Sequence, residues 1–318
     1  MKISNSHTAP ILLGTAMLFL ILFRRVFLNL AHFWYTPFYP MDYSSGNYII
    51  YNDIRYIPER LLILAVAMQI LTFAIPALLY IKLLKGEGYV KELNLKLPPV
   101  RHVPVALYGL GAIVAGTALL SSLIYYAGGT LELRAAAIDS GGNPVYNISV
   151  VVVFILLPAV LEEFFFRSVM IKEYSRYGAV CACIVSAAAF AMIRFSFVLF
   201  PVYFFVGVIL YIIVKATGSV FYAVAAHAGA EFFNIYGWSR LSNVLMFEHN
   251  WFIFSFLAAV VFVLFIIALL NRVEKICYHK AYSAAPMPEN VTAGLRGIKV
   301  FSPMLFAVLI IYFIDINI

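Results

Sequence analysis

The stretch Trp251–Leu270 reads WFIFSFLAAVVFVLFIIALL and contains no charged side chain. About 20 consecutive apolar residues are enough for one helix to cross the hydrocarbon core of a bilayer. The rest of the chain has the same character, because 64% of its 318 residues are hydrophobic and only 12% are charged. An average soluble domain has about 25% charged residues. This composition excludes a soluble globular protein and a disordered chain, and it indicates a polytopic membrane protein.

Nine apolar runs are candidate membrane spans. The first contains Arg24 and Arg25, and charge is costly at the centre of a bilayer, so we expect this run to be tilted or interfacial. We therefore predict an all-α fold, a polytopic membrane helix bundle of about eight transmembrane helices. The runs are Pro10–Phe33, Arg60–Leu84, Val103–Ala127, Asn147–Ile171, Ala179–Phe197, Phe200–Lys215, Val220–Trp238, Trp251–Leu270 and Val300–Ile316.

The net charge of +7 raises the question of whether the chain binds nucleic acid or only a membrane. No Lys/Arg-rich stripe with interleaved aromatic residues is present, so we expect no nucleic-acid partner. The basic residues lie between the apolar runs, and loops rich and poor in them alternate. The segments Lys82–Arg101 and Arg272–Lys299 are the rich ones, so they are predicted to be cytoplasmic. The expected surroundings are the lipid bilayer, and the oligomeric state stays open.

The chain divides into three parts by the distribution of its charged residues. Residues 1–146 are predicted to form N-terminal transmembrane helices and loops, and residues 241–318 C-terminal helices with a cytoplasmic basic loop. The middle part, residues 147–240, has ionisable residues inside three consecutive apolar segments. The three cysteines have neither the spacing of a disulfide framework nor that of a metal site. The middle part is therefore the predicted functional core.

The first of these segments, Leu157–Arg167, reads LPAVLEEFFFR. Ionisable residues within the membrane are functional candidates, because burying them is costly. On a helix, Glu163 and Arg167 are four residues apart with the acid first, the favourable order for an ion pair. Glu162 points about 100° away from Glu163, which leaves its carboxylate free for general-base chemistry. The alternative is a salt bridge that only locks two helices, but two adjacent glutamates favour catalysis.

The other two segments are FAMIR, which ends at Arg194, and HAGAEFFN, which begins at His227. Arg194 lies near the end of its run, so a snorkelling arginine is the alternative there. His227, Glu231 and Asn234 recur at helical spacing and share one face. Because the three segments are consecutive, we predict that their ionisable residues line one buried polar cavity. These residues are Glu162, Glu163, Arg167, Arg194, His227 and Glu231.

The motifs resemble those of the CAAX-processing and bacteriocin-processing (CPBP, or Abi) family of intramembrane glutamic endopeptidases, which includes type II CAAX prenyl endopeptidases. The resemblance covers about Val150–Trp238 and rests on the E-E-x-x-x-R motif after LPA. It also rests on Thr217–Val220 (TGSV), which leads to Ala225–Ala228 (AAHA). It implies that a glutamate and a histidine activate a water that attacks a peptide carbonyl. The last motif's histidine and asparagine would help to hold the oxyanion.

Carried over by position, the resemblance makes Glu162 the general base, with Glu163 and Arg167 as its supporting pair. His227 would be the histidine of the last motif. The resemblance implies a peptide or prenylated-peptide substrate, no cofactor and no metal. It also leads us to expect an integral multi-pass protein of a prokaryotic cell membrane.

Two positions depart from the family pattern. Arg194 stands where the second motif has histidine, and Glu231 stands where the third has asparagine. Arginine donates hydrogen bonds but cannot accept a proton, and an ionised glutamate would repel an oxyanion. Each change alone should weaken hydrolysis. Together they predict compensation, in which Arg194 and Glu231 form a buried ion pair and Arg194 acts as the electrophilic donor.

The sequence therefore predicts an intramembrane glutamic-type endopeptidase. The alternative is a catalytically silent family member that binds a peptide or a partner, as an immunity protein or a scaffold. A third possibility is a metal-dependent membrane hydrolase or an ion-coupled transporter, because carboxylates and histidine are acceptable zinc ligands. The chain has no H-E-x-x-H motif and no pair of broken repeat helices, so this third class is disfavoured.

Overall fold

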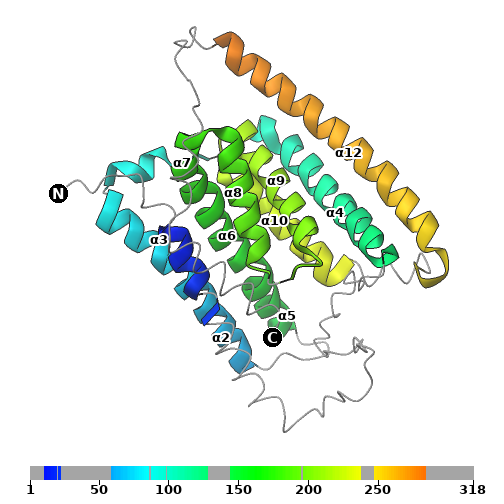
Figure 1. Ribbon diagram of the computed structural model, residues 1–318, viewed down its shortest axis with the longest axis horizontal. Coiled ribbons are helices and arrows are strands. Elements are labelled where there is room, and N and C mark those ends of the chain that lie inside the picture. Colours follow the sequence, from blue (N-terminus) through cyan, green and yellow to red (C-terminus); the bar gives the residue numbers. More distant parts are fainter. Residues whose placement is uncertain are drawn as a thin grey trace.

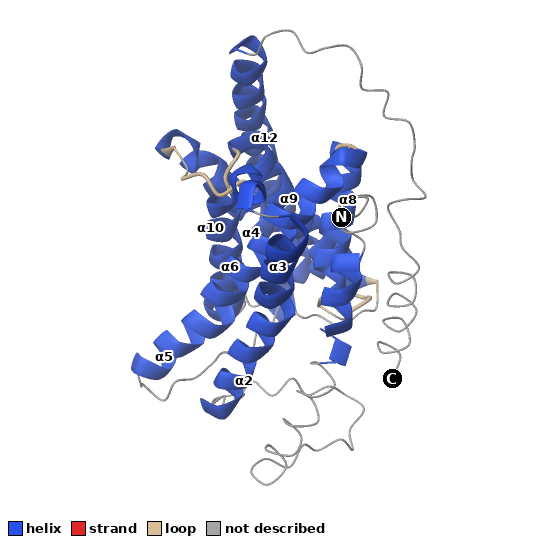
Figure 2. Ribbon diagram, turned by 90° about the vertical axis from the view of Figure 1, so that its left-hand side faces the viewer, coloured by secondary structure: helices blue, strands red, loops and turns tan. Residues whose placement is uncertain are grey.

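The structure, a computed structural model, describes residues 11–19, 21–22, 59–85, 87–97, 99–127, 144–194, 196–237 and 247–283. Every regular element in these ranges is a helix, which confirms the all-α prediction. The helices pack side by side in one bundle, as two views at right angles show (Figures 1 and 2).

Five helices in the described ranges are long and apolar enough to cross a membrane. The chain is therefore an integral multi-pass membrane protein. The count of about eight spans stays a prediction, because Val300–Ile316 and most of Pro10–Phe33 lie outside the described residues. The five long helices are Leu62–Leu83, Val100–Tyr126, Pro144–Tyr177, Phe200–Thr217 and Trp251–Cys277, and Ala179–Met192 is a shorter apolar helix.

The described helices are of three kinds, α-helical, π-helical and 3₁₀-helical. In chain order they are α2 (Glu59–Gln69), a π-helical stretch (Ile70–Ala74), α3 (Ile75–Tyr80), a second π-helical stretch (Ile81–Lys85), two 3₁₀ helices (Glu87–Glu92 and Val100–His102), α4 (Val103–Tyr126), α5 (Pro144–Val150), π-helical Val151–Leu156, α6 (Leu157–Glu163), π-helical Phe164–Met170, α7 (Ile171–Tyr174), 3₁₀-helical Ser175–Tyr177, α8 (Ala179–Met192), α9 (Phe200–Thr217), α10 (Val220–Phe232), π-helical Phe233–Gly237 and α12 (Phe247–Ser283).

The centre of the bundle is formed by α6, α8, α9 and α10, which contact one another directly or through the π-helical stretch after α6. Helix α4 packs against α9 and α10, and α12 packs along the outer side of α4 (Figure 1). One hydrophobic core runs through most of these helices. Most of the large apolar side chains of α12 are exposed, as expected for a helix that faces lipid.

The helix from Pro144 to Tyr177 widens twice, on both sides of the two glutamates. Pro158 lies in the first turn of α6, directly after the π-helical stretch Val151–Leu156. Proline has no N–H and its ring clashes with the carbonyl four residues earlier, so a helix must widen or kink ahead of it. The second widened stretch, Phe164–Met170, contains Arg167. The glutamates therefore sit on a short α-helical segment between two π-helical stretches.

Tight turns return the chain across the bundle on both sides of the α8–α9 pair. Gly178, before α8, has a φ of 108°, and Gly218, after α9, has a φ of 73°. Only glycine adopts such φ values at little cost. The predicted span Ala179–Phe197 is wrong at its C-terminal end. Helix α8 ends at Met192, and a turn follows.

Candidate active site

The deepest part of the predicted site is an ion network between α6 and α10. Arg167 Nε lies 3.1 Å from Glu163 Oε2, and neither side chain is exposed. Glu163 Oε1 lies 2.9 Å from Nδ1 of His227, which is 2% exposed. Buried charges are tolerated only when other groups compensate them. Glu163 therefore bridges the arginine and the histidine and fixes both.

Arg167 also donates a hydrogen bond from Nη2 to the backbone carbonyl of Gly207 on α9, at 3.4 Å. A Cβ at Gly207 would lie 2.8 Å from the Cα of Ala187 on α8. The absence of a side chain thus lets α9 approach α8 closely. Sequence reasoning missed Gly207, and its only signal was a small residue inside an apolar run.

The ring of Phe190, on α8, contacts three of the predicted site residues. Its centroid lies 4.4 Å from the Arg167 guanidinium and 5.4 Å from that of Arg194, distances at which a ring attracts a cation. The ring also meets the imidazole of His227 edge to face at 5.4 Å. Phe190 thus shields two positive charges that lie near each other. In the sequence, Phe190 is only the first residue of the FAMIR segment, and the pattern indicates no role for it.

Arg194 lies in the turn after α8 and contacts Glu162, His227 and Glu231. Its Nη2 is 3.0 Å from Glu231 Oε1, 3.4 Å from Glu162 Oε2 and 3.4 Å from His227 Nε2. The guanidinium also lies 5.2 Å from the ring of Tyr203, another contact that the sequence did not indicate. Helix α8 ends at Met192, two residues before Arg194. The contact predicted between Arg194 and Glu231 is present, but the pair is not fully buried, because its side chains are 25% and 19% exposed.

The surroundings of His227 decide which of its nitrogens faces Glu162. Because Nδ1 lies beside Glu163, a neutral ring carries its proton on Nδ1, and this N–H donates a hydrogen bond to the carboxylate. Nε2 is then an acceptor, 4.0 Å from Glu162 Oε2 and 3.6 Å from Glu231 Oε1. In its neutral form the histidine therefore presents an acceptor nitrogen to Glu162.

Glu231 has a second contact on its own helix. Asn234 Nδ2, in the following π-helical turn, donates to Glu231 Oε2 at 3.4 Å. His227, Glu231 and Asn234 therefore lie on one face of the helix, as expected, and Glu231 contacts both of the others. The amide orients the glutamate that replaces the family's asparagine.

The structure thus brings all six predicted residues into one cluster, and none of them lies elsewhere. Glu162 and Glu163 come from α6, and Arg167 from the π-helical stretch that follows. Among the described residues, no group of three or more His, Cys, Asp or Glu side chains is arranged to hold a metal ion. The cluster itself contains three carboxylates, one imidazole and two guanidinium groups, which are groups capable of proton transfer and charge stabilisation.

Comparison with protein families gives the same result as the motifs. Residues 144–233 match the family model described as type II CAAX prenyl endopeptidase Rce1-like, so this part of the chain is similar to an Rce1-like domain of the CPBP/Abi type. The matched segment is under a third of the chain and contains all six site residues. No curated protein and no solved structure matched the chain.

Proposed function

We propose that this protein is an intramembrane glutamic-type endopeptidase that cleaves a peptide or prenylated peptide near the membrane. One observation carries the proposal: the carboxylate of Glu162, 2% exposed, faces Nε2 of His227 at 4.0 Å within an Rce1-like domain. A single water can donate hydrogen bonds to two acceptors at this separation. The pair is therefore suited to orient and deprotonate that water.

In the first step Glu162 accepts a proton from the water, and the water oxygen forms a bond to the carbonyl carbon of the substrate. The negative charge then moves to the carbonyl oxygen. Arg194 stabilises this oxyanion, since its guanidinium is always charged and its side chain is 25% exposed. When the C–N bond breaks, the proton on Glu162 passes to the leaving amine. Glu163 and Arg167 keep His227 oriented throughout.

Arg194 has a donor available for this role. Its Nη2 is used by Glu162, Glu231 and His227, but its buried Nε has no hydrogen-bond partner among the described residues. Buried polar atoms normally have a partner, so a donor left over beside the general base is suited to donate a hydrogen bond to a substrate oxygen. Glu231 neutralises part of the arginine's charge without occupying Nε.

The test measures cleavage of matched farnesylated and unfarnesylated fluorogenic peptides by the purified, detergent-solubilised protein. Glu162→Gln should lower the rate at least about 100-fold, because a general base contributes about 10²–10⁴. Membrane insertion should not change, since an acid is removed from an apolar helix. Glu274→Gln, an exposed glutamate on α12, is the matched control. Equal rates for Glu162→Gln and the wild type would exclude the glutamic mechanism.

A second candidate is a catalytically silent member that binds a peptide without cutting it. The observation in its favour is that Arg194 Nη2 lies 3.4 Å from both Glu162 and His227, at the position where the water must enter. In this case the wild type binds the peptides but cleaves none. Replacing the two departing residues by the family's own, in the variant Arg194→His/Glu231→Asn, should then create hydrolysis.

A further inference from the structure

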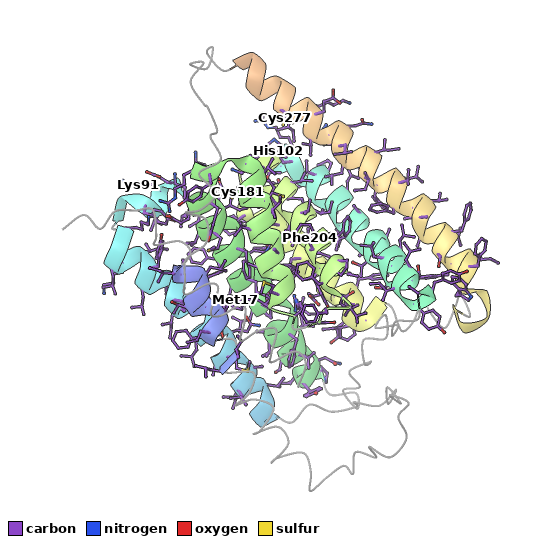
Figure 3. All side chains as sticks on the ribbon, viewed as in Figure 1. Met17, Lys91, His102, Cys181, Phe204 and Cys277 are labelled. Atoms are coloured by element: carbon purple, nitrogen blue, oxygen red, sulfur yellow. The ribbon has the colours of Figure 1, made fainter. Side chains whose placement is uncertain are left out.

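A second polar site lies away from the candidate active site. It is at the end of the bundle that carries Lys91, Lys96 and Lys172, which we call the basic end. Three separate parts of the chain surround a cavity of about 560 Å³ there. They are residues of the 91–99 connection that leads to α4, Lys172 of α7, and the turn 217–219 between α9 and α10. Figure 3 shows Lys91 toward the end of the bundle at which α7 lies in Figure 1. No residue of the candidate active site lines this cavity.

The cavity is held in shape by hydrogen bonds between the connection and the turn. The backbone N–H of Val220 donates to the carbonyl of Asn94 at 2.8 Å, and Ser219 Oγ donates to the carbonyl of Lys96 at 2.9 Å. Gly218, with its positive φ, has open space where a Cβ would be. These bonds hold the backbone of the connection against the turn, so the floor of the pocket does not depend on a ligand.

The charge of the lining favours an anion. It contains three lysines, Lys91, Lys96 and Lys172, and one acidic residue, Glu92, which gives a net charge of +2 at neutral pH. Lys172 is paired with Glu92, Nζ to Oε2, at 2.5 Å. Lys91 and Lys96 are exposed, so their ammonium groups carry the excess positive charge. Ammonium groups are compact donors that bind phosphate as point charges.

Exposed apolar side chains adjoin these lysines. Leu97, which lines the pocket, is 87% exposed, and Val100 is 82% exposed at the start of the membrane-spanning helix Val100–Tyr126. Side chains of this kind at the end of a span are expected to contact the interfacial region of a bilayer. The pocket thus combines positive charge with an apolar rim at the end of a membrane-spanning helix, where lipid headgroups are expected.

We propose that this pocket binds the phosphate group of an anionic phospholipid. Lys91 and Lys96 pair with the phosphate, and the acyl chains pass over Leu97 into the bilayer. A soluble phosphate would share the charge complementarity, but it would leave the apolar rim unused. The lipid is therefore the ligand that matches both features of the site.

The test uses the full chain, purified in a nonionic detergent and given equal amounts of phosphatidylglycerol and phosphatidylcholine with the same acyl chains. Native mass spectrometry should show preferential retention of phosphatidylglycerol. A lysine near a membrane surface contributes about 1 kcal/mol, or about fivefold in affinity, so Lys91→Gln/Lys96→Gln should weaken retention about 25-fold. Lys275→Gln, an exposed lysine on α12 that is outside the pocket, should leave it unchanged.

Equal retention of the two lipids by the wild type would overturn the proposal without any variant. An equal loss in Lys275→Gln and in the double variant would also overturn it, because the effect would then come from the general charge of this end. A third arm adds inorganic phosphate to lipid-free protein. If phosphate raises the Tm as much as phosphatidylglycerol does, the ligand is a soluble phosphate and the lipid assignment is wrong.

Discussion

Two ion pairs in this protein lie in opposite surroundings. Arg167 and Glu163, at the candidate active site, are 3.1 Å apart and fully buried. Lys172 and Glu92, at the basic end, are 2.5 Å apart, with side chains 39% and 58% exposed. The shorter contact belongs to the more exposed pair. Because water already solvates exposed charges, distance alone does not measure what a pair contributes to stability.

A third pair lies between these extremes. Arg194 and Glu231 are 3.0 Å apart and 25% and 19% exposed. If exposure determines how much unfolding free energy is lost when a pair is broken, the loss should be largest for the most buried pair. It should not follow the order of the distances. The predictions below test this order, from the buried pair to the exposed one.

The largest effect is expected for Arg167→Met. This change keeps an unbranched apolar stem but removes the guanidinium 3.1 Å from Glu163, which would leave that buried carboxylate with His227 as its remaining partner. Breaking a buried pair costs roughly 3–5 kcal/mol of unfolding free energy. Thermal and denaturant unfolding of the purified protein measure it.

The matched control is Arg176→Met. Arg176 also pairs with a buried glutamate, Glu173, but its own side chain is 30% exposed and Lys85 remains 3.0 Å from the same carboxylate. This variant should be clearly more stable than Arg167→Met. Equal losses would show that the remaining lysine and the solvent do not compensate Glu173, and the argument from exposure would fail.

The contrast between these pairs also shows which parts of the site a sequence can predict. The pair Glu163–Arg167 was predictable because both residues lie on one helix at a spacing of four. The common cluster was predictable because ionisable residues are rare inside apolar runs, which makes each of them informative. The contact between Glu163 and His227 joins residues 64 positions apart, so its atoms and distances depend on how α6 and α10 pack.

Other features left no trace in the sequence pattern. The apolar run that contains α8 continues to Phe197, but the helix ends at Met192, because hydropathy does not report where the backbone turns. Gly207 resembles any other small residue of an apolar helix until its distance from Ala187 is known. The division into three parts at residues 146 and 240 and the catalytic roles of the six residues stay predictions.

The second prediction concerns Arg194 and Glu231, the partly exposed pair. Arg194→His and Glu231→Asn should each destabilise the protein, because each leaves one charge without its partner. The double variant should recover part of the loss, with a coupling energy of about 1–3 kcal/mol in a double-mutant cycle. Partial exposure should keep each single loss below that of Arg167→Met.

The cycle distinguishes two origins of the departing residues. A coupling near zero would show that the two residues do not compensate each other, although they are 3.0 Å apart. Activity measured on the same four proteins is a separate readout. It tells whether the pair supports hydrolysis or blocks it, independently of its effect on stability.

The smallest effect is expected for the exposed pair, and it should depend on pH. The hydrogen bond from Lys172, and then the positive charge of that lysine, lower the pKa of the Glu92 carboxyl below its ordinary value. A lowered pKa in the folded state means that the pair stabilises the protein above the ordinary pKa of a glutamate, about 4.3. This contribution is lost as the pH falls through the lower pKa of the folded state.

Lys172→Gln should therefore lower the Tm slightly at pH 7, and the difference from the wild type should disappear at acidic pH, measured in lipid-free detergent. Glu92→Gln should behave in the same way. A Tm difference that stays constant across this pH range would mean that Lys172 acts through packing and not through its charge.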